Sequence, residues 1–215
     1  MLLNYLYDKY YERSAFCAAA NIDLQTLDKW ESANLVPKAS YIMDNDLQVK
    51  SFVADHQETQ KYEFYLKGQL EWLAQIADKN ITTENAARHY FETQYGFAIE
   101  RFLATELGQK IAEIYPQSAW NLDDYTETWQ HFLVGTYGLC TRSGLPNEIF
   151  LKHVYIRFIK FVTQTNRPNE IKLKLLDMLS QAVEALDKVE SDFAPHEVAQ
   201  SSRQRCIINI RKNYL

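Results

Sequence analysis

Apolar residues recur at helical spacing along most of this 215-residue chain, and this periodicity constrains the fold more than any other feature. Only six glycines and five prolines interrupt the pattern, which is too few for a fold built from many strands and turns. The chain is therefore predicted to be mainly α-helical. The expected helices cover residues 60–79, 83–95, 97–115, 123–134, a stretch that begins at Pro146, 168–191 and 195–213.

Short signals mark where several of these helices should begin or end. Pro146 and Pro168 each open the same four letters, Pro-Asn-Glu-Ile, and proline suits the first turn of a helix because its missing N–H would be unpaired there. Gly96 is expected to interrupt one helix, and Pro116 to end the next. Together, these signals predict a body of about six helices.

The first part of the chain predicts a helix-turn-helix. Ser14 can cap a short helix over residues 15–20, and Asp23 can cap a second helix over residues 24–33 after a three-residue turn. Asn34 suits the left-handed exit of the second helix.

Residues 40–52 are the best candidate for β-structure, and they predict a hairpin that completes a small N-terminal module. Its predicted parts are a strand at 41–43, a polar turn at 44–46 and a strand at 47–49. A flexible connection is expected near residues 54–59. The chain is accordingly divided into a winged-helix-like module, residues 1–55, and a helical body, residues 60–215.

The run SAFCAAANIDLQTLDKWESANLVP resembles the start of MerR-type regulators, which carry a winged helix-turn-helix. Lys29 stands where that family has its first aromatic residue, and Asp28 where it usually has arginine. The resemblance covers about 30 residues, and it implies a winged helix-turn-helix over about residues 14–50 and duplex DNA as the ligand. The matching positions are Ala18, Ile22, Thr26, Leu27, Trp30, Glu31, Leu35 and Pro37.

The charge of this module argues against DNA, because phosphate affinity needs a positive field. Asp23, Asp28 and Glu31 accompany the second helix, and Asp44 and Asp46 lie in the predicted wing. The alternatives are a structural or protein-contacting module, or unrelated short helices. If DNA is bound, the expected contacts are Gln25, Thr26, Lys29, Lys38 and Lys50, with phosphate contacts added by Arg203, Arg205, Arg211 and Lys212.

Three of the six glycines lie within residues 135–146, between two expected helices. This loop precedes a helix N-terminus, so it is a candidate pocket for a small anionic ligand. Cys140 is either a reactive thiol near histidines or a small buried apolar residue. The loop matches no phosphate-binding, dinucleotide or nucleophile-elbow motif, so no catalytic residue is assigned. The candidate pocket residues are His131, Gly138, Cys140, Thr141, Arg142, Ser143, His153 and Arg157.

The segments GTYGLCTRSGLP and SSRQR resemble an uncharacterised group of bacterial helical proteins associated with natural-product biosynthesis. No activity follows from that resemblance. A basic run overlaps the same region and is expected to be a solvated face or a polyanion patch. Its members are Lys152, Arg157, Lys160, Arg167, Lys172 and Lys174.

Composition excludes several classes of protein. The net charge of -5 does not suit a general nucleic-acid coat. Three widely spaced cysteines without a CxxC pair favour reduced thiols and a cytoplasmic protein. No two histidines lie three or four residues apart, so neither a metal nor a cofactor is expected. The N-terminus does not look like a signal peptide, and no window is apolar enough to span a membrane.

These features favour a bacterial cytoplasmic regulator or accessory protein rather than an enzyme. Its N-terminal module would contact DNA or a protein partner, and its body would sense a ligand or form a homodimer. The first alternative is a ligand-binding protein or enzyme with a pocket at residues 135–146. The second alternative is a structural scaffold without a site.

Overall fold

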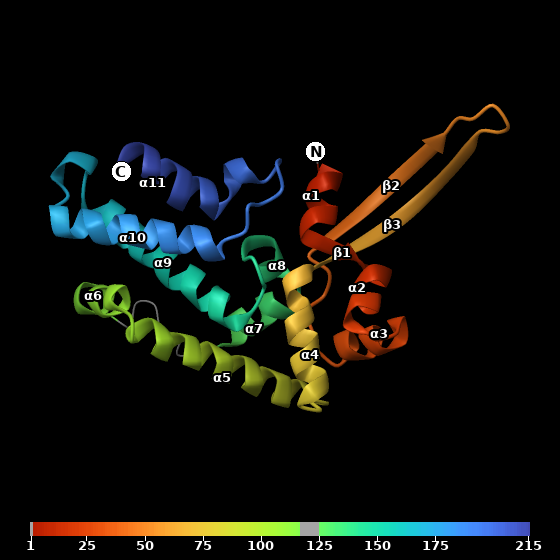
Figure 1. The fold of residues 1–215 in the computed structure, drawn as a ribbon, viewed down its shortest axis with the longest axis horizontal. Helices are drawn as coiled ribbons and strands as arrows, with labels where there is room; N and C mark the ends of the chain where they lie inside the picture. Colours follow the sequence, from red (N-terminus) through yellow and green to blue (C-terminus); the bar gives the residue numbers. More distant parts are fainter. Residues whose placement is uncertain (1, 117–124) are drawn as a thin grey trace.

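The computed structural model describes residues 2–116 and 125–215, apart from the side chain of Asn169. Helices predominate in these ranges, as the helical spacing predicted (Figure 1). The α-helices are α1 (Leu2–Lys9), α2 (Arg13–Ala20), α3 (Leu24–Ser32), α4 (Leu70–Asp78), α5 (Glu84–Leu103), α6 (Glu106–Ile114), α7 (Thr126–Leu133), α8 (Thr136–Cys140), α9 (Pro146–Thr165), α10 (Leu173–Val189) and α11 (Asn209–Asn213). The strands are β1 (Tyr10–Glu12), β2 (Tyr41–Val49) and β3 (His56–Leu66).

The three strands form one antiparallel sheet in the order β1-β3-β2. The β2–β3 hairpin is longer than predicted, because residues 44–46 continue β2 and the connection lies at residues 50–55. The predicted flexible connection at 54–59 and the predicted helix from residue 60 are both wrong over β3. Alternate side chains of β3 pack on α1 and β1, two elements that the sequence did not predict. This small cluster consists of Leu6, Tyr10, Phe64 and Leu66.

The helix pair α2–α3 forms as predicted, although α2 begins earlier. Glu12, rather than Ser14, caps α2 by accepting a hydrogen bond from the Ser14 N–H at 3.1 Å. The Asp23 carboxylate caps α3 by accepting from the Thr26 N–H at 2.7 Å. Asn34 has the expected left-handed conformation, with φ of 54°.

One predicted break in the helical body is wrong, another break occurs instead, and one helix begins later than predicted. Helix α5 runs through Gly96 without interruption, because glycine lowers helix stability by too little to break a well-packed helix. The chain breaks after Leu103, where the Thr105 side chain caps α6 by accepting from the Gly108 N–H at 3.0 Å. Pro168 opens only a 3₁₀ turn, and α10 begins at Leu173.

The remaining helix boundaries agree in part with the predictions. Helix α9 begins at Pro146, as expected, and α7 ends at Leu133. The expected acidic start of that helix at Asp123 and Asp124 lies outside the described residues. The predicted last helix is regular only near its end, where a π-helical turn (Gln204–Ile208) leads into α11.

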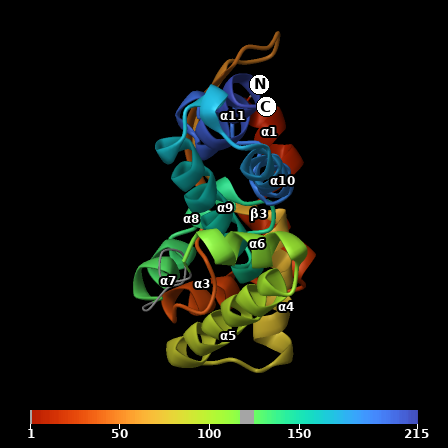
Figure 2. The ribbon, with the colours of Figure 1, turned by 90° about the vertical axis from the view of Figure 1, so that its left-hand side faces the viewer.

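One hydrophobic core links the N-terminal elements to the helical body. It extends from Phe16 in α2 to Ile210 in α11. Near its middle, Trp72 packs on Phe132 with 4.9 Å between ring centroids, and its indole N–H donates to the Leu35 carbonyl at 2.8 Å. Figure 2 shows α6 between α5 and α10, both of which it contacts. Within residues 2–116 and 125–215, no helix has the length and apolar character needed to cross a membrane.

Candidate functional site

The outward face of α3 carries three of the residues that the MerR resemblance assigns to DNA contact. Gln25 and Lys29 are exposed, and Thr26 is half-buried. On the opposite face of α3, Leu27 is fully buried in the core. This packing fixes the helix so that Gln25 and Lys29 face solvent.

The basic group nearest the acids of α3 is already bonded within the N-terminal elements. The Arg13 guanidinium donates to the carboxylates of Asp28 and Glu63, the latter at 2.6 Å. The Tyr65 hydroxyl donates to Glu31 at 2.7 Å, and burial raises the pKa of the Glu31 carboxyl. These contacts pair Arg13, the only arginine of α2 and α3, with acids of its own module.

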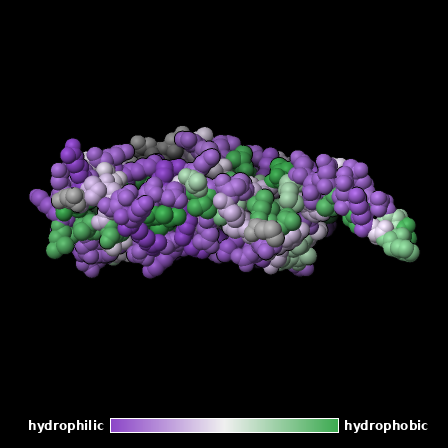
Figure 3. Space-filling view, turned by 90° about the horizontal axis from the view of Figure 1, so that it is seen from above, coloured by the Kyte–Doolittle hydropathy of each residue, from purple (hydrophilic) through white to green (hydrophobic). Residues whose placement is uncertain are grey.

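The β2–β3 hairpin extends away from the rest of the molecule (Figure 1). At its tip, the residues Phe52 and Val53 are 105% and 90% exposed. Figure 3 shows apolar residues at the end of the protruding arm, whose flanks are hydrophilic. The charged residues of the hairpin are Asp44, Asp46, Asp55, Glu58 and Glu63, against Lys50 and Lys61.

The two lysines expected to flank the wing lie at opposite ends of β2. Lys38 is at the base of the hairpin, where its backbone N–H donates to the Leu133 carbonyl at 2.9 Å. Lys50 lies at the tip, beyond a strand of nine residues, which spans about 30 Å. The structure therefore does not bring these two lysines together.

The expected loop over residues 135–146 is wrong for Thr136–Cys140, which form α8. This glycine-rich loop segment forms the joint between the N-terminal module and the helical body. Gly135 has φ of 79°, and a β-carbon there would lie 2.6 Å from the Lys38 carbonyl oxygen. A β-carbon at Gly138 would lie 2.0 Å from the Ser40 hydroxyl oxygen. The Tyr10 hydroxyl also donates to the Gly138 carbonyl at 2.8 Å. These two glycines allow residues 38–40 to approach the loop closely.

Cys140 and Thr141 face the interior of this joint. Burial raises the pKa of the Cys140 thiol, whereas a nucleophilic cysteine needs a lowered pKa. The fully buried Thr141 hydroxyl donates to the Tyr137 carbonyl at 2.8 Å and accepts from the Gly144 N–H at 2.9 Å. Both residues are therefore placed as parts of the loop's internal structure.

A buried ion pair next to the loop has no signal in the sequence. Lys152 is 7% exposed, and its ammonium lies 3.3 Å from a carboxylate oxygen of the fully buried Glu190. Ser202 joins them, because its hydroxyl donates to Glu190 and accepts from Lys152. Burial raises the pKa of the Glu190 carboxyl. The expectation that Lys152 lies on a solvated face or polyanion patch is wrong, because its ammonium is buried with a partner 38 residues away.

The His153 imidazole lies between two tyrosine hydroxyls. Its Nδ1 is 3.3 Å from the Tyr95 hydroxyl, and its Nε2 is 3.4 Å from the Tyr137 hydroxyl. Burial, reinforced by the positive charges of Lys152 and Arg157, lowers the pKa of His153 to about 3. The ring is therefore neutral near pH 7.

His131 lies on the other side of Tyr137, with 6.4 Å between ring centroids. It is exposed and lies 3.6 Å from the Glu127 carboxylate. Among the described residues, neither His131 nor His153 has a hydrogen bond to Cys140. No group of three or more His, Cys, Asp or Glu side chains within residues 2–116 and 125–215 is placed to hold a metal ion.

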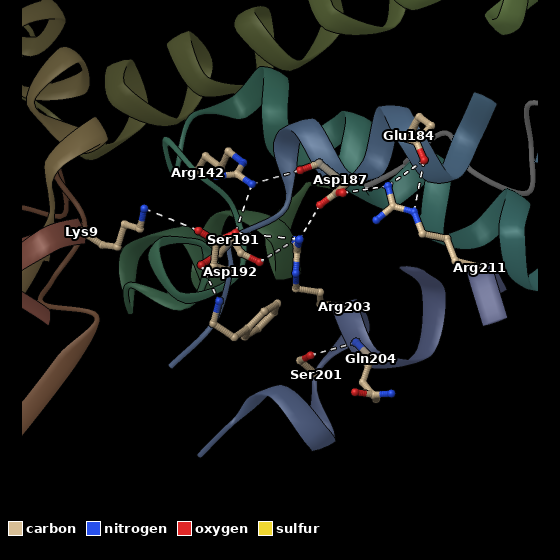
Figure 4. Close-up of polar contacts among 11 residues, drawn as sticks. Lys9, Arg142, Glu184, Asp187, Ser191, Asp192, Ser201, Arg203, Gln204 and Arg211 are labelled. Atoms are coloured by element: carbon tan, nitrogen blue, oxygen red, sulfur yellow. Dashed lines mark hydrogen bonds and ion pairs between the residues drawn. The ribbon is translucent and has the colours of Figure 1, made fainter. Parts of the chain in front are cut away.

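Arg142 belongs to a surface cluster of ion pairs (Figure 4). Its guanidinium donates to the Asp187 carbonyl and to the Asp192 carboxylate, both at 3.2 Å. Arg203 and Arg211 contact the Asp187 carboxylate at 2.5 and 2.8 Å. Burial opposes ionisation of Asp187, but these two arginines outweigh it and hold the pKa of that carboxyl below its usual value. The three arginines are therefore already paired with acids.

Ser143 lines a separate cavity of about 270 Å³ between α4, α5 and the start of α9. Its backbone N–H donates to the Glu148 carboxylate at 2.6 Å. Thr141 and Arg142 instead line a smaller cavity of about 140 Å³. The predicted pocket residues thus lie on several surfaces rather than around one cavity.

A protein-family model matches residues 87–215, which is more than half of the chain. It is described as a family of unknown function, DUF6058. The chain belongs to the DUF6058 family. No curated protein and no solved structure matches it.

The DUF6058 match covers some of the candidate sites and not others. It begins within α5 and includes the glycine-rich loop, the Lys152–Glu190 pair and the arginine cluster. Helices α2 and α3 and the β2–β3 hairpin lie before it. The surface formed by α3 and the β2–β3 hairpin therefore lies outside the part of the chain that the family model covers.

Proposed function

We propose that this chain is a cytoplasmic regulatory or accessory protein whose residues 2–66 form a winged-helix-like module that binds a protein partner. Its element order, from α1 through β3, and its sheet order, β1-β3-β2, support that architecture. In this assignment, α3 takes the place of the recognition helix and the β2–β3 hairpin that of the wing. The resemblance of residues 14–50 to MerR-type regulators is independent support.

The charge of the two contact elements favours a protein over DNA. DNA binding releases counterions only where basic side chains meet phosphates, and this surface carries an acidic excess. The acids of α3, its cap and the hairpin are Asp23, Asp28, Glu31, Asp44, Asp46, Asp55, Glu58 and Glu63, and the bases are Lys29, Lys50 and Lys61.

The bare apolar tip of the hairpin is the observation that carries the proposal. Phe52 and Val53 are almost completely exposed at the end of an acidic arm. Aromatic side chains that enter a pocket are typical anchors of protein interfaces. The complementary partner surface is an apolar pocket with a basic rim.

Site-specific photo-crosslinking in cells that naturally make the protein tests this proposal. A crosslinking amino acid at position 52 should give a discrete adduct that resists nuclease and is destroyed by protease. Position 109 on α6, also exposed, is the matched control. A nuclease-sensitive adduct from position 29 would identify DNA instead, and adducts no stronger than those from position 109 would refute a contact through the hairpin.

Phe52→Asp provides the quantitative arm of the same test. Loss of an anchoring aromatic residue at an interface typically costs about 2 kcal/mol or more. Binding of the crosslinked partner should therefore weaken at least about tenfold, while Gln109→Asp leaves it unchanged. Equal affinities for the two variants would contradict the proposal.

A further inference from the structure

Two adjoining hollows follow the groove between α5 and α9, which lie side by side in Figure 1. They have volumes of about 270 and 220 Å³, and Arg101 and Asn147 line both of them. The first is also lined by Glu71, Trp72, Gln75, Tyr90, Gln94, Ser143, Leu145, Pro146 and Glu148. The second is also lined by Ala98, Phe102, Thr105, Leu151 and Tyr155.

The two hollows differ sharply in chemistry. The first is polar, with the carboxylates of Glu71 and Glu148 and the side-chain amides of Gln75 and Gln94. Glu148 is held in place by the Ser143 N–H, and Gln75 accepts a hydrogen bond from the Tyr90 hydroxyl at 3.2 Å. The second hollow is mainly apolar. A molecule that fills both must therefore be polar at one end and apolar at the other.

Arg101 stands where the two hollows meet. Its Nε donates to the Phe97 carbonyl, one turn earlier in α5, at 3.2 Å. Within residues 2–116 and 125–215, no carboxylate lies in ion-pair contact with its guanidinium. The two terminal nitrogens are therefore available to bind a carboxylate in the bidentate arrangement that arginine favours.

We propose that this groove binds a small zwitterion with an apolar side group, the chemistry of an apolar amino acid or a dipeptide that contains one. Its carboxylate pairs with Arg101, its ammonium faces Glu71 and Glu148, and its side group enters the apolar hollow. A simple anion suits the groove less well, because the polar hollow holds two carboxylates and one guanidinium. This inference is independent of the partner proposed for the N-terminal module.

Isothermal titration calorimetry on the full chain tests the chemistry of the ligand. L-phenylalanine, L-leucine and glycyl-L-phenylalanine are the probes, and the tightest of them should bind with a Kd below about 1 mM. Their ranking distinguishes a free amino acid from a dipeptide. L-serine, phenylalaninamide and 3-phenylpropionate lack the apolar side group, the carboxylate and the ammonium respectively, so each should bind at least tenfold more weakly.

Two variants test the location of the site. Arg101→Gln removes the guanidinium, and Leu151→Trp fills the apolar hollow, so each should weaken binding at least tenfold. Arg205→Gln, an exposed arginine that donates to the Gln200 carbonyl, is the matched control and should bind normally. The proposal is overturned by no binding of any probe at about 10 mM, by equal binding of L-serine, or by unchanged binding in Arg101→Gln.

Discussion

At the scale of single residues, the environment of His153 couples the stability of the fold to pH. The ring is enclosed by two tyrosine hydroxyls, and its pKa is lowered to about 3. In the unfolded chain, a histidine has a pKa of about 6.5. The pKa of His153 is therefore lower in the folded state than in the unfolded chain. Its neutral ring makes its full contribution to stability above about pH 6.5, where neither state binds the proton. That contribution is progressively lost as the pH falls from about 6.5 toward 3, because only the unfolded chain takes up the proton.

We predict that the free energy of unfolding decreases by up to about 1.4 kcal/mol per pH unit below pH 6.5 because of this one group. Urea unfolding of the wild type and of His153→Gln between about pH 7.5 and 4.5 measures the difference. The variant should show a smaller slope, whatever its absolute stability. His89→Gln, which changes an exposed ring outside the surroundings of His153, serves as the matched control. Parallel profiles for the wild type and His153→Gln would contradict the prediction.

Lys152 and Glu190 show what sequence patterns cannot reveal at this scale. Lys152 lies among other basic residues in the sequence, so a solvated face or polyanion patch was expected. Its acidic partner is 38 residues away, and the serine that joins them lies still further along the chain. A long-range pair of this kind depends on the packing of α9 against the segment after α10, which local periodicity does not specify.

At the scale of elements, glycine is required at one position in a loop and is not required at another in a helix. Gly135 has a left-handed backbone and closely approaches the Lys38 carbonyl. Gly96 lies within α5, where a β-carbon would meet nothing within 4 Å. Only the first of these positions needs glycine.

We expect Gly135→Ala and Gly96→Ala to change stability in opposite directions. Alanine at 135 should lower the free energy of unfolding by more than about 1 kcal/mol, through backbone strain and the clash with Lys38. Alanine at 96 should raise it by about 0.5–1 kcal/mol, because alanine is the better helix former. Chemical denaturation of both variants beside the wild type measures these changes, and changes of the same sign would show that the loop is not a strained joint.

Sequence signals predicted the local ends of several elements, because those signals act over a few residues. Asp23, Asn34 and Pro146 are examples, since each sets the backbone or a hydrogen bond at one helix end. The predicted turn at residues 44–46 was wrong because Asp44 and Asp46 lie on the exposed face of β2, where a strand can carry acidic side chains. Residues 60–66 suited a helix because Tyr62, Tyr65 and Leu66 are three and four residues apart. So short a window does not distinguish a helix from a strand.

At the scale of the whole molecule, the N-terminal elements and the helical body are tied together. The Tyr41 hydroxyl donates to Glu197 at 2.6 Å, and the Ser40 hydroxyl to the Gly135 carbonyl at 3.0 Å. The main core also runs without a gap from α2 to α11. The loop expected to form a pocket serves as this joint, and the sequence could not predict that role without the position of residues 38–40.

We therefore predict a single cooperative unfolding transition for the described elements. Hydrogen–deuterium exchange followed by mass spectrometry along a urea series reports on β1, β3 and α10 separately. Peptides from all three should lose protection at the same midpoint, because unfolding of either part exposes the shared core. A clearly lower midpoint for β1 and β3 than for α10 would instead support two independent domains, divided after β3.

The strand order β1-β3-β2 also has a consequence at high protein concentration. Among the described residues, β2 has no strand on its outer side, so the nine residues of this exposed edge form a template for edge-to-edge polymerisation. If two copies paired antiparallel about Asn45, Asp44 of one would lie opposite Asp46 of the other, and like charges opposite each other are destabilising. The acids that make the arm unsuited to phosphate thus also oppose this pairing of two arms.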